Sequence, residues 1–311
     1  MTTLCRYEHF KRCLESLERC TGAEYTDVYV ALDYPANESH IEGWKKIDAF
    51  LKEKEQKNGF KTLNVRRRDH NCGVGKPGSN GSLLYQEIKT ITDKFISFED
   101  DNEFAPCFLE YINKGLEKYQ DDERVISICG YTPFEYKGPE NVYFARQESA
   151  WGHGVWIRKK EKIDKLADLN VIHNLLLDSK SVMKIYRFRP TLLNRMLNQE
   201  ILGEVHGDVC NVCYCVLYDS YSLFPSKSLV RNWGNDGSGV HCKNVNEAIA
   251  KKSLSLESTF EIDDVDVSEK KVIYDEFKKI VTKGWCGNTA ILLRYIIWRI
   301  TRMDLFKLLR K

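Results

Sequence analysis

Three consecutive acidic residues, Glu99, Asp100 and Asp101, are the strongest chemical signal in the sequence, and they follow an apolar run at 94–98. Carboxylates this close together repel one another unless a cation or hydrogen bonds offset their charge. Oxygen ligands suit Mg²⁺ or Mn²⁺, which can share their coordination with a diphosphate. The spacing alone leaves a plainer interpretation open, in which the acids form a solvated loop and Asp101 or Asn102 caps the next helix.

Two glycine-containing segments have the composition of loops that contact a ligand. Residues 71–81 hold four glycines, which would let bare backbone approach a ligand closely. The segment is not a P-loop, because Lys76 is not followed by Ser or Thr in the required frame, and a flexible connection is the alternative. Residues 151–156 combine two tryptophans with His153, and such side chains stack on sugar rings and bond hydroxyl groups. A core tryptophan pair beside a turn has the same composition.

The chain has eleven cysteines, and their scattered positions form no disulfide pattern. Residues 1–10 carry no apolar signal segment, so we expect reduced thiols and a cytoplasmic location. His206, Cys210, Cys213 and Cys215 are residue types that bind zinc. The helical spacing of the cysteines among apolar residues instead predicts small, buried core side chains. No cysteine has the sequence context of a protease nucleophile.

Alternating strands and helices must position these residues. Their order predicts right-handed crossovers and an α/β fold with a mostly parallel sheet covered by helices on both faces. Ligands bind at the carboxyl ends of such strands, where Asp33, residues 71–81 and the three acids should meet. The predicted strands are 28–32, 61–65, 94–98 and 125–129, and the predicted helices are 7–20, 41–55, one through Leu84, Ile88 and Ile91, and one opened by Pro106.

The pattern changes after Gly130. Residues 131–158 are rich in aromatics and glycine, which predicts loops and short strands around a site. Residues 209–218 and the chain from 268 onward have helical patterns, and 231–242 is a glycine-rich loop.

Length and composition exclude several classes of protein. The chain has 311 residues, 42% of them hydrophobic and 30% charged, which fits a soluble globular enzyme with one large α/β domain or one domain and an appendage. With a formal net charge of +2, the chain lacks the strong excess of basic residues that is typical of a nucleic-acid-binding protein. No apolar run reaches the roughly 18 residues of a membrane-spanning helix.

Taken together, these segments resemble the inverting, GT-A-fold glycosyltransferases of family 2 found in bacterial capsule and O-antigen loci. They are more distantly similar to the N-acetylglucosaminyltransferase I type. The order and spacing of the matching segments, which run from Thr2 to about Cys242, are more specific than any single match. The segments are 3–6 (TLCR), 32–35 (LDYP), 71–73 (NCG), 98–101 (FEDD), 106–109 (PCFL), 128–131 (ICGY), 151–154 (WGHG) and 233–242 (WGNDGSGVHC).

The resemblance implies a Rossmann-like GT-A catalytic domain over residues 1–245. Residues 1–130 would be its nucleotide-sugar-binding half and 131–245 its acceptor-binding half, with a helical C-terminal segment over 246–311. Family members have a full apolar strand before the first matching segment. Here only Met1 and Thr2 precede it, so we expect a shortened first strand.

The resemblance also implies roles for individual residues. In the family the acidic triplet is the metal-binding motif called DXD, so Asp101 would bind Mn²⁺ or Mg²⁺ directly, and His241 is the candidate second ligand. Asp208 lies near the position of the catalytic carboxylate and is the predicted general base, with Glu204 as the alternative, although its neighbours depart from the usual Trp-Asp pattern. The predicted nucleotide-sugar site consists of Thr3, Arg6, Asp33, Gly73 and Asp100, and the predicted acceptor site of Trp151, His153 and Trp233.

The predicted function is the transfer of a sugar, with inversion, from a nucleotide-diphosphate-sugar donor such as a UDP-sugar. The acceptor would be a saccharide or a lipid-linked saccharide in surface polysaccharide biosynthesis. One alternative is a sugar-nucleotide nucleotidyltransferase, which would need a basic phosphate-binding loop near the first strand that we do not find. A catalytically inactive carbohydrate-binding relative is the other alternative.

The C-terminal segment has a basic amphipathic pattern. Residues 290–311 interleave apolar side chains with six Lys or Arg residues and a single acid, Asp304. Such a helix suits the headgroup layer of an anionic membrane, so we expect peripheral contact with the cytoplasmic face of the inner membrane. A helix that packs its apolar face on the catalytic domain would show the same pattern.

Overall fold

The computed structural model describes residues 1–234, 236, 253–281 and 285–303, and it has an α/β fold. The N-terminal part is a parallel sheet in the order β1-β2-β3. Helix α1 buries Phe10, Cys13, Leu14 and Leu17 on one face, the spacing that the sequence predicts. The elements here are β1 (Thr2–Thr3), α1 (Tyr7–Glu18), η1 (Ala23–Tyr25), β2 (Asp27–Leu32), η2 (Glu38–His40), α2 (Ile41–Gln56), β3 (Thr62–Arg67) and α3 (Asn80–Ile88).

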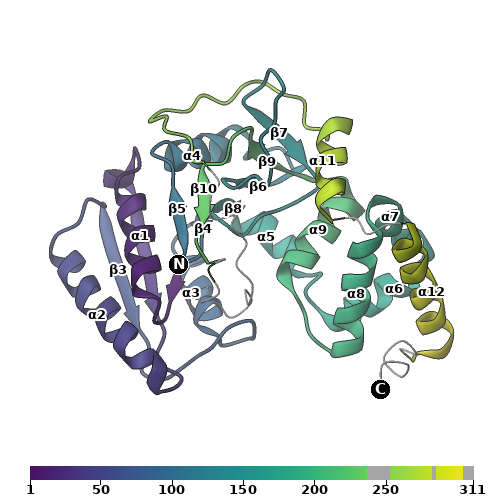
Figure 1. Cartoon of the computed structure of the whole chain (residues 1–311), viewed down its shortest axis with the longest axis horizontal. Coiled ribbons are helices and arrows are strands. Elements are labelled where there is room, and N and C mark those ends of the chain that lie inside the picture. The colour runs from purple at the N-terminus through teal and green to yellow at the C-terminus, as the bar shows by residue number, and fades with distance from the viewer. Residues whose placement is uncertain (235, 237–252, 282–284, 304–311) are drawn as a thin grey trace.

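A second sheet of five strands lies at the centre of the molecule (Figure 1). Its order is β4-β8-β6-β9-β7, and only β6 and β9 run parallel to each other. The α/β class with a parallel sheet is therefore confirmed, but the parallel arrangement is concentrated in β1 to β3. Its strands are β4 (Lys94–Ser97), β6 (Val125–Cys129), β7 (Val142–Ala145), β8 (His153–Trp156) and β9 (Tyr221–Pro225).

Helix α4 (Phe108–Lys118) packs closely on the five-stranded sheet. A Cβ atom added to Gly154 in β8 would lie 2.5 Å from Ile112 of α4, and one added to Gly115 would lie 2.8 Å from Ile128. Glycine at both positions lets helix and strand approach closely. This contact fixes β8, and with it the residues that precede β8 at the sheet edge.

A two-stranded antiparallel ribbon joins distant parts of the sequence. Strand β5 (Asn102–Phe104) follows the acidic triplet directly and pairs with β10 (Val230–Asn232). Because Asn232 pairs with Asn102, residues 232–234 are brought beside Asp101.

Helices α6 to α9 and α12 gather at one end of the molecule, opposite α1 and α2 (Figure 1). They share a core that includes Leu193, Met196, Val216, Tyr295 and Trp298. The helices after β8 are α5 (Ile157–Asp164), α6 (Leu169–Leu177), α7 (Ser179–Phe188), α8 (Pro190–Leu202), α9 (Gly207–Tyr218), α11 (Lys271–Val281) and α12 (Trp285–Thr301). Within the described ranges, none of the helices has both the length and the hydrophobicity to cross a bilayer.

Candidate active site

The carboxyl ends of β1, β2 and β4 bring the predicted donor-site residues together. Thr3 ends β1, Arg6 precedes α1, and Asp33 follows β2. Asp100 and Asp101 follow β4 after a short connection. The edge predicted from the strand order is therefore the edge at which these side chains lie.

Asp100 is held by both of the residues from the first strand and turn. The Arg6 guanidinium donates to Asp100 Oδ1 at 2.5 Å, and the Thr3 hydroxyl donates to Oδ2 at 2.9 Å. Burial raises the pKa of Asp100, and the charge of Arg6 opposes that rise. The contact joins residues that are 94 positions apart, so it fixes the N-terminal turn to the acidic triplet.

Asp101 is enclosed more completely, with 5% of its surface exposed. Arg6 Nη2 donates to Oδ2 at 2.9 Å, and Asn232 Nδ2 donates to Oδ1 at 2.6 Å. The backbone N–H of Trp233 donates to the Asp101 carbonyl oxygen at 2.9 Å. A Cβ atom added to Gly234 would lie 2.1 Å from Oδ2, so glycine is required for this close approach.

Glu99 completes a cluster of three carboxyl groups around one guanidinium. Glu99 is more exposed than Asp100 and Asp101, but partial loss of solvent around its carboxyl group raises its pKa to about 7, with smaller contributions from the charges of Asp101 and Asp100. Arg6 and a hydrogen bond from the Trp151 side chain act in the opposite direction. The cluster therefore carries more negative charge than Arg6 can neutralise.

The chemistry of this cluster fits a hard divalent cation, because its donors are carboxylate oxygens and its charge is in excess. Among the described residues, however, no group of three or more His, Cys, Asp or Glu side chains is arranged to hold a metal ion. The second predicted ligand, His241, lies outside the described residues. The metal site stays a prediction, with Asp101 as its ligand from this edge.

Asp33 holds the glycine-rich loop. Its Oδ1 accepts hydrogen bonds from the backbone N–H groups of Tyr34 and Cys72, both at 2.9 Å, and its Oδ2 accepts one from Gly73 at 3.0 Å. Gly73 has φ +68°, a conformation that favours glycine. The carboxylate predicted to bind the nucleoside thus shapes the loop that borders the predicted nucleoside site.

The predicted acceptor residues Trp151 and His153 lie at the start of β8, next to the acids. The rings of Trp151 and Tyr131 pack edge to face with centroids 4.6 Å apart. His153 Nε2 lies 3.2 Å from Glu148 Oε1, and the buried His153 Nδ1 atom has no hydrogen-bond partner among the described residues. Glu148 Oε2 accepts a hydrogen bond from Asn211 Nδ2 at 2.9 Å.

Asp208, the predicted general base, lies in the first turn of α9. Its Oδ2 is 2.5 Å from Arg195 Nη2 on α8, and 55% of its side chain is exposed. The N-cap position belongs to His206, so Asp208 does not cap α9. Asn211 lies one turn further along the same face, so its bond to Glu148 links this end of α9 to the segment before β8.

The Trp233 side chain is not a free surface for stacking of a sugar ring. Its indole N–H donates to Glu103 at 2.8 Å. The guanidinium of Arg12 lies 4.4 Å from its ring centroid, and that of Arg231 lies 5.2 Å away. The Trp233 side chain therefore already packs against Arg12 and Arg231 and is bonded to Glu103. The alternative base Glu204 is exposed, and it lies 3.9 Å from His206.

Four contributors to this region were not predicted: Tyr131, Glu148, Asn211 and Asn232. Glu148 and Asn211 carry no motif and lie 63 positions apart. Asn232 lies one residue before a matching segment, and only the pairing of β10 with β5 brings it to Asp101.

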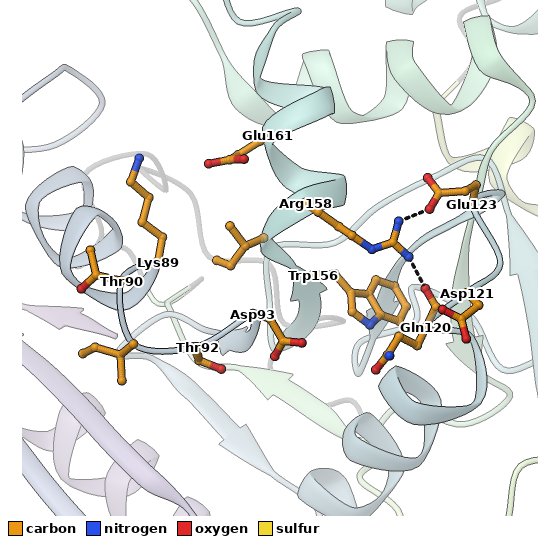
Figure 2. A pocket seen from close by; sticks show the side chains of 12 residues that line it. Lys89, Thr90, Thr92, Asp93, Gln120, Asp121, Glu123, Trp156, Arg158 and Glu161 are labelled. Atoms are coloured by element: carbon orange, nitrogen blue, oxygen red, sulfur yellow. Dashed lines mark hydrogen bonds and ion pairs between the residues drawn. The ribbon is translucent and has the colours of Figure 1, made fainter.

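A cavity of about 720 Å³ is lined by residues that include Asp93 and Trp156 (Figure 2). Asp93 precedes β4 and Trp156 ends β8, so this cavity lies at the end of the two strands opposite Glu99, Asp100 and Asp101. Arg158 points across it to Glu123 and donates to the Gln120 carbonyl oxygen at 2.5 Å. Acidic and basic side chains both line it, including Lys89, Asp93 and Glu161. None of the predicted site residues that the structure describes lines this cavity.

No protein-family model matches the chain, and comparison with curated proteins finds no match.

Proposed function

We propose that the protein is an inverting, metal-dependent glycosyltransferase that moves a sugar from a nucleotide-diphosphate donor to a saccharide or lipid-linked saccharide. The observation that carries this proposal is the hydrogen-bonded cluster of Thr3, Arg6, Asp100 and Asp101 at the carboxyl edge of the strands. Ligands of open α/β sheets bind at this edge. The resemblance to family 2 enzymes gives the same residues a donor-binding role.

The donor would lie along this edge. Thr3, Arg6 and the loop held by Asp33 would bind the nucleoside, because they border the ends of β1 and β2. The diphosphate would lie toward Asp101. A divalent cation held by Asp101 would stabilise the charge that the leaving diphosphate acquires.

Transfer requires one bond to form and one to break. The oxygen of the acceptor hydroxyl forms a bond to the anomeric carbon of the donor sugar, and the bond from that carbon to the phosphate oxygen breaks. The nucleoside diphosphate leaves with the electron pair, and the hydroxyl proton passes to the Asp208 carboxylate. Because attack comes from the face opposite the leaving group, the anomeric configuration inverts.

Trp151 and His153 would position the acceptor between the donor edge and α9. Trp151 already contacts Glu99 and Tyr131, so an acceptor ring stacked there would lie next to the donor site. Covering this region with aromatic side chains would also exclude water, which would otherwise hydrolyse the donor.

We place the enzyme in the cytoplasm with peripheral contact to the inner membrane. Helix α12 supports this proposal, because it packs on α8 through one face and leaves another face apolar. Leu293, Ile296 and Ile300 of α12 are between 42% and 77% exposed. An apolar stripe of this kind suits the boundary between headgroups and acyl chains.

The experiment that tests the function is a donor screen followed by assays of product. Thermal shift with UDP-sugars and other nucleotide sugars, with and without Mn²⁺, should identify a donor that stabilises the protein only with the metal. Hydrolysis of that donor to nucleoside diphosphate would support a transferase. Release of pyrophosphate from a nucleotide triphosphate and a sugar phosphate would instead identify a nucleotidyltransferase. Binding without either reaction would identify an inactive relative.

A further inference from the structure

Arg189, which precedes Pro190 at the start of α8, is a half-buried cation. Among the residues that the structure describes, its guanidinium makes no hydrogen bond. The guanidinium carbon lies 5.5 Å from the centroid of the Phe188 ring. Burial lowers the pKa of Arg189 to about 10, while Glu269 opposes this and Arg195 adds to it. A charge withdrawn from water in this way is costly unless a partner neutralises it.

Arg146 is a second cation beside the same ring. Its guanidinium carbon lies 5.8 Å from the Phe188 centroid, and its buried Nε atom has no hydrogen-bond partner in the part of the chain that the structure describes. The carboxylates nearest to it are not at hydrogen-bond distance, since Asp219 is 3.8 Å away and Glu269 is 4.0 Å away. Within the described part of the chain, two neighbouring guanidinium groups therefore have N–H donors without an acceptor.

The acids around this ring do not neutralise both arginines. Asp208 pairs with Arg195 at 2.5 Å, and Asp219 pairs with Lys184 at 2.7 Å. Glu269 is left to face both Arg146 and Arg189, and 4% of its side chain is exposed. Burial raises the pKa of Glu269, and the backbone N–H of Arg146 and the charges of Arg146 and Arg189 oppose that rise. Among the residues that the structure describes here, three carboxylates (Asp208, Asp219 and Glu269) therefore face four cations (Arg146, Lys184, Arg189 and Arg195), which leaves one positive charge in excess.

The excess charge lies on the acceptor side of the proposed active site. Arg195, the ion-pair partner of Asp208, follows Arg189 by six residues on α8, a rise of about 9 Å. A substrate whose hydroxyl group reaches Asp208 could therefore extend along α8 to Arg189.

We propose that Arg189 and Arg146 form an anion site for the acceptor substrate. The site takes the oxygens of a phosphate or carboxylate group, which the planar donors of arginine recognise in pairs. Such a group would belong to the diphosphate of a lipid-linked acceptor or to an acidic sugar of the saccharide. This inference rests on the proposed glycosyltransferase function for the identity of the ligand, but the anion site itself does not depend on catalysis.

The first test measures binding of inorganic phosphate at equilibrium, with the full-length protein and without donor. Phosphate should raise the melting temperature of the wild-type protein and of the control Arg187→Gln, whose side chain is exposed at the end of α7. It should not raise that of Arg189→Gln. In phosphate-free buffer Arg189→Gln should melt no lower than wild type, because it removes a cation that lacks a partner. An equal phosphate-induced shift in all three proteins would overturn the proposal, and so would a large loss of stability in Arg189→Gln without phosphate.

The second test identifies the source of the anion. Three acceptors with one core saccharide are compared: a neutral form, a form linked to a lipid diphosphate, and a form with a terminal uronic acid. Arg189→Gln should raise KM about 10- to 100-fold for the acceptor that the site binds, the range for hydrogen bonds to charged groups. It should leave KM for the neutral form unchanged, and Arg189→Lys should be intermediate. Unchanged KM for all three acceptors contradicts the proposal. Failure of the proposed function is distinguishable, because the wild-type protein would then transfer no sugar while the phosphate measurement still decides the anion site.

Discussion

At the scale of single residues, Arg6 determines the electrostatics of the donor edge. It contacts both Asp100 and Asp101 through the same nitrogen, Nη2. Its single charge partly neutralises three carboxyl groups. A divalent cation at Asp101 would therefore share or replace a contact that Arg6 now makes, while the donor diphosphate would give Arg6 a new partner.

Asp101→Asn tests the acid that the structure encloses most completely. We expect kcat to fall by about 10² or more, because the variant removes a charge needed at the leaving group, as when a preorganised electrostatic partner is lost. Mn²⁺ binding, followed by electron paramagnetic resonance, should weaken as well. Asp121→Asn is the matched control, since Asp121 is exposed beside the distant cavity. Full activity in excess EDTA would contradict the metal requirement.

The roles of Asp208 and Arg195 can be distinguished by substituting each residue in turn. Asp208→Asn should lower kcat by about 10² or more with little change in donor affinity, since the general base is lost. Arg195→Gln keeps the carboxylate and should retain most of kcat. If Asp208 only forms a surface ion pair, the two variants should behave alike, and each should change stability by about 1 kcal/mol or less.

At the scale of elements, the pairing of β5 with β10 is what encloses Asp101. Asn232 donates to its carboxylate and the Trp233 N–H donates to its carbonyl oxygen, while Gly234 leaves no room for a Cβ atom beside Oδ2. The ribbon therefore connects a late part of the chain to the acidic triplet.

Gly234→Ala should disturb this arrangement, because the added Cβ would lie 2.1 Å from Asp101 Oδ2. We expect weaker Mn²⁺ and donor binding, together with a lower melting temperature. Gly207→Ala is the control, since no atom lies within 4 Å of its added Cβ. Unchanged metal and donor binding in Gly234→Ala would show that the close approach has no functional role.

Lys159 of α5 holds the segment between α4 and β6 in place through hydrogen bonds. It is 2% exposed, and its ammonium group donates to the carbonyl oxygens of Tyr119, Asp122 and Val125 at 2.8–3.0 Å. Lys159→Met would leave these acceptors without that partner, so we expect a loss of about 2–5 kcal/mol of unfolding free energy in urea titrations. A smaller loss than that of an exposed control, Lys162→Met, would contradict this role.

The same lysine predicts a pH dependence of the unfolding free energy. Burial lowers the pKa of Lys159 from 10.5 to about 8. Between these values the unfolded chain holds the proton and the folded chain does not, so the unfolding free energy should rise with pH across that window. Below about pH 8 this increment is absent. The difference in slope between wild type and Lys159→Met, measured from pH 8 to 10.5, checks the sign.

At the scale of the whole molecule, the donor edge belongs to the N-terminal sheets and the proposed acceptor side to the helices at the other end (Figure 1). Helix α12 joins the helical core, with Tyr295 and Trp298 6% and 3% exposed. Arg294 donates to Asn194 and Asn198 of α8, both at 2.7 Å. The same helix thus packs on the protein and presents its exposed stripe outward.

Substitutions on the two faces of α12 should therefore separate packing from membrane contact. Ile296→Ser with Ile300→Ser should abolish sedimentation with anionic liposomes and leave the melting temperature unchanged. Trp298→Ala should cost about 3–5 kcal/mol of stability, as for a large side chain removed from a core. If binding of the wild-type protein to anionic liposomes weakens as the salt concentration increases, the basic side chains contribute to that binding. If the wild-type protein ignores liposomes at every salt concentration, the membrane proposal is wrong.

The amino-acid sequence by itself determined the local elements and the edge at which the site lies. The predicted strand 125–129 and helix 41–55 match β6 and α2 closely, because the spacing of apolar residues records which face of each element is buried. The position of Asp100 and Asp101 after a strand was likewise readable, since acids that follow an apolar run must lie at its end.

Only the tertiary structure decided which distant groups meet. The pairs Arg6 with Asp100, Glu148 with Asn211, and Asn232 with Asp101 are separated by 94, 63 and 131 positions. The mixed five-stranded sheet also depends on how β8 returns between β4 and β6. Hydrophobic periodicity reports whether a side chain is buried, but it carries no information about its partner. Those partners follow from packing of the whole chain, which is why they could not be read from local sequence.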